Sequence, residues 1–176
     1  MKSATRLRLV LGDQLNASHS WFREKHQGTL YVIAELHQEA SYTKHHAQKI
    51  SAFFAAMSQF ADALEQAGHR VLHLTLDDTA QYQDLPALLA ALFQRHNVDH
   101  FEYQLADEYR LRHQLENFAQ GLTIKVTPYE TEHFYLKDAE LAHYFQQGKK
   151  HRLEHFYRKM RLRFNVMMEG DEPLGG

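Results

Sequence analysis

The chain has 176 residues, of which 44% are hydrophobic and 24% are charged, with only 8 Gly and 3 Pro. This composition excludes a disordered or low-complexity chain, and the length suits one domain with a buried core. The sequence contains no Cys, so it offers no disulfide, thiolate metal ligand or cysteine nucleophile. No apolar run reaches the roughly 18 residues of a membrane span, and no signal peptide begins the chain, so we expect a cytoplasmic protein.

The formal net charge of −2 conceals an uneven distribution of charge. Residues 1–148 carry 13 Lys and Arg against 18 Asp and Glu, whereas residues 149–176 carry 7 against 4. The basic surface is therefore concentrated near the C-terminal end of the chain. A local basic excess is typical of a nucleic-acid or docking surface, but also of an ordinary solvated helix face.

Five short runs rich in β-branched and aromatic residues predict strands. They are residues 6–11, 30–34, 71–74, 100–105 and 122–126. Apolar residues spaced three and four apart predict helices between them, namely residues 50–64 with Gly68 as a C-terminal cap, 85–93 and 108–118. Strands that alternate with helices predict a doubly wound (Rossmann-like) α/β fold, with a five-stranded parallel sheet and helices on both faces.

A helical extension without a further strand is predicted after the sheet, over residues 137–164. The end of the chain, residues 169–176, is acidic and rich in Gly and Pro, which is linker composition. We therefore expect an α/β domain over 1–136, a helical connector over 137–168 and the start of a linker over 169–176.

Polar residues follow the predicted strands at the point where each strand ends. Gly12, Asp13, Gln14 and Leu15 follow the first strand, Glu35 the second, Asp77 and Asp78 the third, and Glu108 the fourth. Because the carboxyl ends of parallel strands meet at one edge, we expect a ligand crevice there. Each Asp taken singly fits a helix N-cap equally well. A cluster of carboxylates repels phosphate, so the crevice suits a neutral ligand rich in hydroxyls and amides.

One glycine replaces the Gly-x-Gly-x-x-Gly pattern in the first turn, which disfavours a dinucleotide site. The string from His151 to His155 matches the H-x-x-E-H pattern of inverted zinc peptidases, but neighbouring Lys and Arg side chains would repel a cation. We therefore expect no metal site and no catalytic residue. Residues 149–164 place an apolar stripe beside basic side chains, which leaves a solvated helix and a docking or nucleic-acid surface both open.

Several of these segments together resemble the N-terminal domain of the deoxyribodipyrimidine photolyase-related family, the prokaryotic iron–sulfur cryptochromes and (6-4) photolyases. The resemblance rests on 12–15, Glu35, 53–57, 76–78, 108–111 and 156–161, in the same order along nearly the whole chain. It implies an α/β domain that binds a light-harvesting antenna, typically dimethyl-ribityl-lumazine, at the carboxyl edge of the sheet. The implied ligand-binding residues are those at the strand ends.

The resemblance also implies a larger parent flavoprotein. Its C-terminal half, beyond this sequence, would hold FAD, an iron–sulfur cluster and the surface that binds damaged DNA, and would pack against this domain. The parent would be a DNA photolyase (lyase) or a blue-light receptor, whereas this fragment alone would not be an enzyme. Two alternatives stay open: a stand-alone nucleotide-binding or nucleotidyl-transfer α/β domain, and an interaction module whose contact surface is the basic helix.

Overall fold

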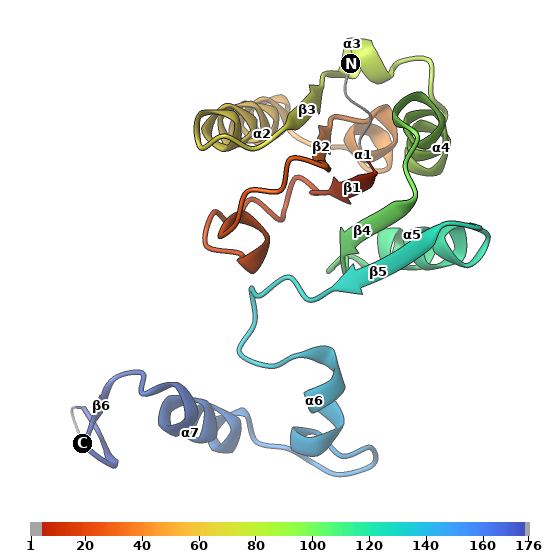
Figure 1. Cartoon of the computed structure of the whole chain (residues 1–176). Helices are drawn as coiled ribbons and strands as arrows, with labels where there is room; N and C mark the ends of the chain where they lie inside the picture. Colours follow the sequence, from red (N-terminus) through yellow and green to blue (C-terminus); the bar gives the residue numbers. More distant parts are fainter. Residues whose placement is uncertain (1–4, 175–176) are drawn as a thin grey trace. The chain divides into compact units, whose positions relative to one another are not determined.

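The computed structural model describes residues 5–174 and contains a parallel five-stranded sheet (Figure 1). Its strands are β1 (Arg6–Leu9), β2 (Thr29–Ala34), β3 (Val71–Leu74), β4 (His100–Gln104) and β5 (Lys125–Tyr129). They lie in the order β3-β2-β1-β4-β5. The chain therefore starts at the central strand, adds β2 and β3 on one side, and then adds β4 and β5 on the other side. This order confirms the predicted doubly wound α/β fold, whose switch point lies between β1 and β4.

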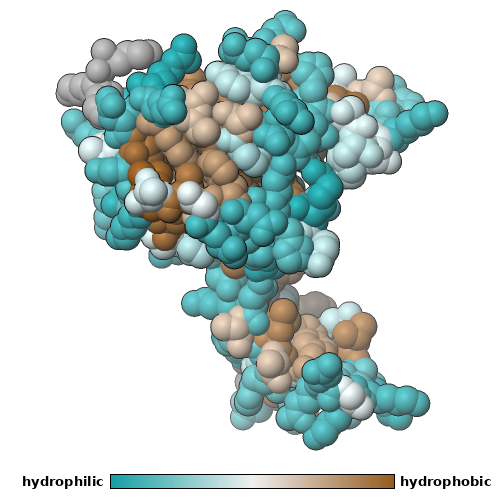
Figure 2. Space-filling model, turned by 90° about the vertical axis from the view of Figure 1, so that its right-hand side faces the viewer, coloured by the Kyte–Doolittle hydropathy of each residue, from teal (hydrophilic) through white to brown (hydrophobic). Residues whose placement is uncertain are grey.

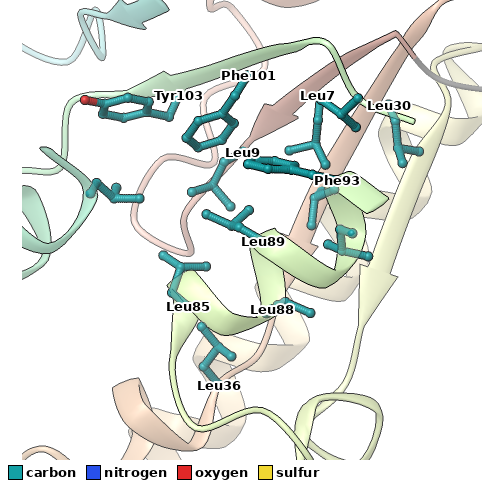
Figure 3. Packing of buried hydrophobic residues seen from close by; sticks show 14 of the residues in the cluster. Leu7, Leu9, Leu30, Leu36, Leu85, Leu88, Leu89, Phe93, Phe101 and Tyr103 are labelled. Atoms are coloured by element: carbon teal, nitrogen blue, oxygen red, sulfur yellow. The ribbon is translucent and has the colours of Figure 1, made fainter. Parts of the chain in front are cut away.

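Helices cover both faces of the sheet because residues alternate between the faces along each strand. Leu7 and Leu9 of β1 pack with α4 (Leu85–His96) and α5 (Tyr109–Gln120) on one face. Figure 3 shows this core, in which side chains of α4, Phe93 among them, meet Leu7 and Leu9 of β1 and Phe101 of β4. Val10 packs on the opposite face, with residues of α2 (Ala47–Gln66). All three predicted helices are present.

The last strand begins three residues later than predicted. Leu122 lies in the turn after α5, and the strand runs from Lys125 to Tyr129 with Pro128 inside it. Proline lacks an N–H, but β5 is an edge strand with a partner on one side only, which tolerates it. The apolar side chains of Leu122 and Ile124 still pack on the core, which explains their strand-like pattern.

Three short helices were not predicted from the periodicity. They are η1 (Ser20–Phe22), α1 (His37–Ser41) and α3 (Leu76–Thr79). Each spans only one turn or little more, which is too short for a 3.6-residue repeat to show. Two of them follow β2 and β3 directly, so they form part of the edge where the predicted crevice lies.

A second compact unit follows Thr131. Within it the structure describes α6 (Asp138–Tyr144), α7 (Leu153–Phe164) and a short antiparallel pair, β6 (Met168–Glu169) and β7 (Glu172–Pro173). The hairpin occupies part of the segment predicted as a linker, with Gly170 at a positive φ of 60° in its turn. We call residues up to 131 the sheet unit and residues from 132 the helical unit.

A charged network is buried against the sheet, on the face that carries α2. The Nε of Arg8 donates to Oε2 of Glu102 at 2.6 Å, and these side chains are only 7% and 2% exposed. Arg8 also donates to the hydroxyl of Tyr31 at 2.8 Å and to the carbonyl of Trp21 at 3.1 Å. Burial opposes the charge of Arg8, but the hydrogen bond to Glu102 and the Tyr31 contact outweigh it and raise the pKa of Arg8.

Candidate functional site

A cavity of about 200 Å³ lies at the carboxyl edge of the sheet, and we call it the acidic cavity. Asp13, Glu35 and Glu108, all predicted for the site, line it. The other lining residues are Ala34, Leu36, Glu39, Ala40, Tyr42, His45, Lys49, Ile50, Phe53, Phe54, Met57 and Leu111. The structure thus brings together carboxylates from the ends of β1 and β2 and from the start of α5.

Gly12 lets α2 pass directly over the first turn. A Cβ at this position would collide with the ring of Phe53 and would lie 2.9 Å from Sδ of Met57. Both of these side chains line the acidic cavity. Gly12 therefore leaves room for the apolar wall, and any larger residue would displace the Phe53 and Met57 side chains from the turn that carries Asp13.

Glu35 is buried and makes two kinds of contact. Its Oε2 accepts a hydrogen bond from the N–H of Leu76 at 3.1 Å, and its Oε1 lies 3.5 Å from Nε2 of His73. The hydroxyl of Thr79 donates to its backbone carbonyl at 2.6 Å. Glu35 therefore lines the cavity and also holds the start of α3.

Glu108 is the N-cap of α5, where its carboxylate accepts from the N–H groups of Arg110 and Leu111, both at 2.9 Å. The guanidinium of Arg110 connects the carboxylate of Glu108 to that of Glu39. The Nη2 of Arg110 lies 3.3 Å from Glu108 and donates to both carboxylate oxygens of Glu39, at 3.1 and 2.9 Å. Arg110 also lies over the ring of Tyr42, 4.6 Å from its centroid. One arginine therefore fixes three lining side chains.

Gln14 and Leu15 lie outside the cavity lining. Gln14 is fully buried: its Oε1 accepts from the N–H of Leu11 at 3.1 Å, and its Nε2 donates to the carbonyls of Gln104 and Leu105 at 3.3 and 3.4 Å. These bonds join the first turn to the end of β4. Leu15 packs on the core of the α2 face. Both residues shape the turn that presents Asp13.

Asp77 and Asp78 lie in the first turn of α3, are exposed and are not part of the cavity lining. Asp78 forms a capping box with Thr75, accepting from its N–H at 2.9 Å and its hydroxyl at 2.8 Å. These two hydrogen bonds, the backbone one first, lower the pKa of Asp78. The helix-cap interpretation therefore describes the contacts of Asp78 in this structure.

The family described as deoxyribodipyrimidine photo-lyase-related protein matches residues 8–176. The chain belongs to this family. It is 30% identical over 174 residues to a (6-4) photolyase of Agrobacterium fabrum, covering 98% of this chain and 34% of the relative. It is 29% identical over 128 residues to an uncharacterized protein of Acanthamoeba polyphaga mimivirus, covering 69% of this chain and 62% of that protein. The chain thus spans about a third of the Agrobacterium relative.

Several cavity residues of this photolyase-related chain were missed by the sequence reasoning. Glu39, Tyr42 and Lys49 come from α1, the segment after it and the first turn of α2. His45 also lines the cavity, and its Nδ1 lies 3.5 Å from Nζ of Lys49. The position of these residues in the sequence could have indicated the site, because the connection after β2 starts at the edge of the sheet where ligands bind.

The zinc-peptidase string lies in the helical unit of the photolyase-related chain. His151 and His155 are exposed, and Glu154 forms an ion pair with Arg158 at 2.7 Å. Within residues 5–174, no group of three or more His, Asp or Glu side chains is arranged to hold a metal ion. In the same part of the chain, no helix has both the length and the apolar character needed to cross a membrane.

Proposed function

We propose that the acidic cavity binds dimethyl-ribityl-lumazine, and that the chain is the N-terminal antenna domain of a photolyase/cryptochrome-family flavoprotein for light-driven DNA repair or blue-light sensing. The observation that carries this proposal is a single cavity with an apolar wall and a set of fixed carboxylates, at the carboxyl edge of the sheet. Membership of the photolyase-related family supports it.

The apolar wall fits a flat heterocycle. Ile50, Phe53, Phe54 and Met57 line the cavity from one helix, α2. Aromatic and thioether side chains pack well against the face of a ring, and small-molecule sites are lined largely by such groups. Phe53 is 43% exposed without a ligand, so a bound ring would cover apolar surface that now faces water.

The polar residues fit a neutral chain of hydroxyls. The carboxylates of Asp13, Glu35 and Glu39 accept hydrogen bonds, and Lys49 supplies a donor for a ring carbonyl. The carboxylates would repel a phosphate group, whereas a neutral ribityl chain needs no balancing charge. These residues would bind and orient the ligand and keep water from its ring. When bound, the antenna supplies light absorption and passes its excitation energy to a flavin.

The parent protein would carry the remaining cofactors. The chain spans 34% of the Agrobacterium (6-4) photolyase, and we propose that residues outside it hold FAD and an iron–sulfur cluster and contact damaged DNA. Because this sequence has no Cys, the cysteine ligands of a cluster would have to come from those residues. Leu153, Tyr157 and Phe164 of α7 are each at least 41% exposed. They offer an apolar surface for that C-terminal half.

A blocking substitution tests the site without removing any of its polar groups. Ala40 lines the cavity, so Ala40→Trp would fill it, whereas Ala55→Trp adds the same bulk at an exposed position of α2 outside the lining. We expect Ala40→Trp to weaken binding of dimethyl-ribityl-lumazine at least tenfold, and Ala55→Trp to leave it unchanged. Ligand fluorescence during titration measures both affinities, and circular dichroism confirms that both variants fold.

The same titration separates the alternatives. Equal lumazine affinity in Ala40→Trp and the unchanged protein would remove the ligand from this cavity. Tight binding of ATP that Ala40→Trp abolishes, without lumazine binding, would favour the stand-alone nucleotide-binding domain instead. The carboxylates of the cavity argue against that outcome because they would repel a triphosphate, and the first turn lacks the Gly-rich pattern of a phosphate-binding loop.

A further inference from the structure

We propose that a second cavity, of about 250 Å³ and wholly within the helical unit, binds a nucleotide unit of a single-stranded nucleic acid. We call it the basic cavity. It lies between the end of α6 and the start of α7, and its cationic lining residues are Lys150, Arg152 and Lys159. His151 and His155 also line it, and its lining, drawn from the described residues, includes no Asp or Glu. Such a hollow attracts phosphate.

Some basic side chains of this unit form ion pairs and others do not. Arg158 and Arg163 form ion pairs with Glu154 and Glu140, both at 2.7 Å. Lys150 and Arg152, by contrast, form no ion pair within the part of the chain that the structure describes. Positive charge that is not balanced by an ion pair therefore lines the basic cavity. Charges without an internal partner are the ones available to neutralise phosphate.

Aromatic rings line the same hollow. Tyr144, Phe145 and Phe156 are half-buried, and their rings contact one another, with centroids of Phe145 and Phe156 5.0 Å apart. The Nζ of Lys159 lies over the Tyr144 ring, 5.7 Å from its centroid. Figure 2 shows hydrophobic and hydrophilic residues next to each other on this unit. Cations that surround aromatic rings are the combination used for unpaired nucleotides, whose bases stack while the backbone meets the cations.

A strand fits this site better than a membrane surface does. The cationic and aromatic side chains line a hollow instead of projecting from a plane, and an anionic bilayer presents a plane of headgroups. A duplex hides the faces of its bases within the stack, so only an unpaired base can reach Phe156. The proposal is therefore specific for single-stranded nucleic acid over duplexes and vesicles.

Two neighbouring residues of α7 provide a matched test. Lys159 lines the basic cavity, whereas Arg158 points its charge at Glu154, and either change to Gln removes one positive charge. Fluorescence anisotropy of a labelled 12-nucleotide oligo-dT, measured at several salt concentrations, gives the affinity and its salt dependence. Because one phosphate contact contributes a slope of about 0.7, Lys159→Gln should weaken binding about fivefold at 0.1 M salt and reduce the slope by about 0.7. Arg158→Gln should change both far less.

An abasic oligonucleotide of the same length tests the aromatic rings without altering the protein. It keeps every phosphate but has no base to stack, so we expect it to bind about five- to a hundredfold more weakly than oligo-dT. Equal weakening by Lys159→Gln and Arg158→Gln would overturn the proposal, because it would show only a general charge effect. So would equal affinity for both oligonucleotides, or binding to phosphatidylserine vesicles without binding to oligo-dT.

Discussion

The acidic cavity and the basic cavity hold their charged side chains in different ways. Glu35 and Glu108 of the acidic cavity accept hydrogen bonds from backbone N–H groups that begin α3 and α5. Lys150 and Arg152 of the basic cavity lie in the turn before α7 and are exposed. In the sheet unit, charged side chains that line the site therefore also stabilise the fold. Substitutions there should change stability and binding together, whereas substitutions in the basic cavity should change binding alone.

The largest effect is expected from the buried network of Arg8 and Glu102 in the sheet unit. Glu102→Leu removes the ion-pair partner of Arg8, whose side chain is only 7% exposed, and leaves a buried charge without its counter-ion. Breaking a buried ion pair in this way costs about 3–5 kcal/mol of unfolding free energy. Urea denaturation followed by circular dichroism measures the loss.

The double variant Arg8→Met, Glu102→Leu is the control for this prediction. It removes both charges from the interior, and replacement of a whole buried pair by apolar residues is often close to neutral. The double variant should therefore regain most of the lost stability. A loss below about 1 kcal/mol in Glu102→Leu alone would mean that Arg8 reaches water when its partner is gone, and that the network does not anchor the sheet unit.

A smaller loss is expected at the turn that presents Asp13. Gln14→Ala leaves the N–H of Leu11 and two carbonyls at the end of β4 without their side-chain partner, which should cost about 1–3 kcal/mol. Asp13→Asn is nearly isosteric at an exposed neighbouring position and should change stability by less than about 0.5 kcal/mol. Urea titrations of both variants decide the matter, and equal losses would show that the turn does not depend on Gln14.

The sequence predicted the framework of the sheet unit because burial leaves a periodic pattern. Leu7 and Leu9 alternate with the residues of the other face, and Met57, Ala61 and Leu64 follow the helical repeat. The start of β5 was misplaced because Leu122 packs on the core from a turn. The pattern of apolar residues indicates which side chains are buried, but it does not indicate whether the backbone is extended.

The candidate site was predictable where it depends on topology. Asp13, Glu35 and Glu108 stand at strand ends, and parallel strands bring such residues together. The other contacts depend on which hydrogen-bond partner each side chain finds. Gln14 turns into the interior, which leaves no mark in the order of residues, whereas Asp78 forms a capping box that follows the T-x-x-D pattern of residues 75–78. Glu39 was missed because α1 is too short for a periodic signal.

Helix capping gives a direct comparison of the two cavities. Glu108→Ala removes the N-cap of α5, where two N–H groups lose their acceptor, and should cost about 1 kcal/mol. Lys150→Ala in the basic cavity should change stability by less than about 0.5 kcal/mol, because its side chain is exposed. Thermal melts of the two variants test this contrast, and a loss in Lys150→Ala as large as in Glu108→Ala would contradict it.

Acid should weaken the sheet unit through two buried histidines and a half-buried one. Burial is the main cause that lowers the pKa of His69, His96 and His100 from 6.5. The unfolded chain then binds more protons than the folded one just below pH 6.5, so stability is full above this pH and falls as the pH decreases through the lowered values. Urea midpoints near pH 7.5 and pH 5.5 should differ in this direction. His69→Gln should reduce that difference, whereas the exposed His46→Gln should keep it.

The smallest effect is expected at the surface of α7. Glu154 and Arg158 are four residues apart in the favourable order, with 64% and 72% of their side chains exposed. Such a pair contributes only about 0.3–0.5 kcal/mol, and salt near 1 M screens it. Hydrogen exchange of the α7 amides should therefore speed up by less than about threefold in Arg158→Gln at low salt, and not at all at high salt. A tenfold or larger increase in the exchange rate would show that paired charges also stabilise the fold of the helical unit. It would contradict the proposed difference between the two cavities.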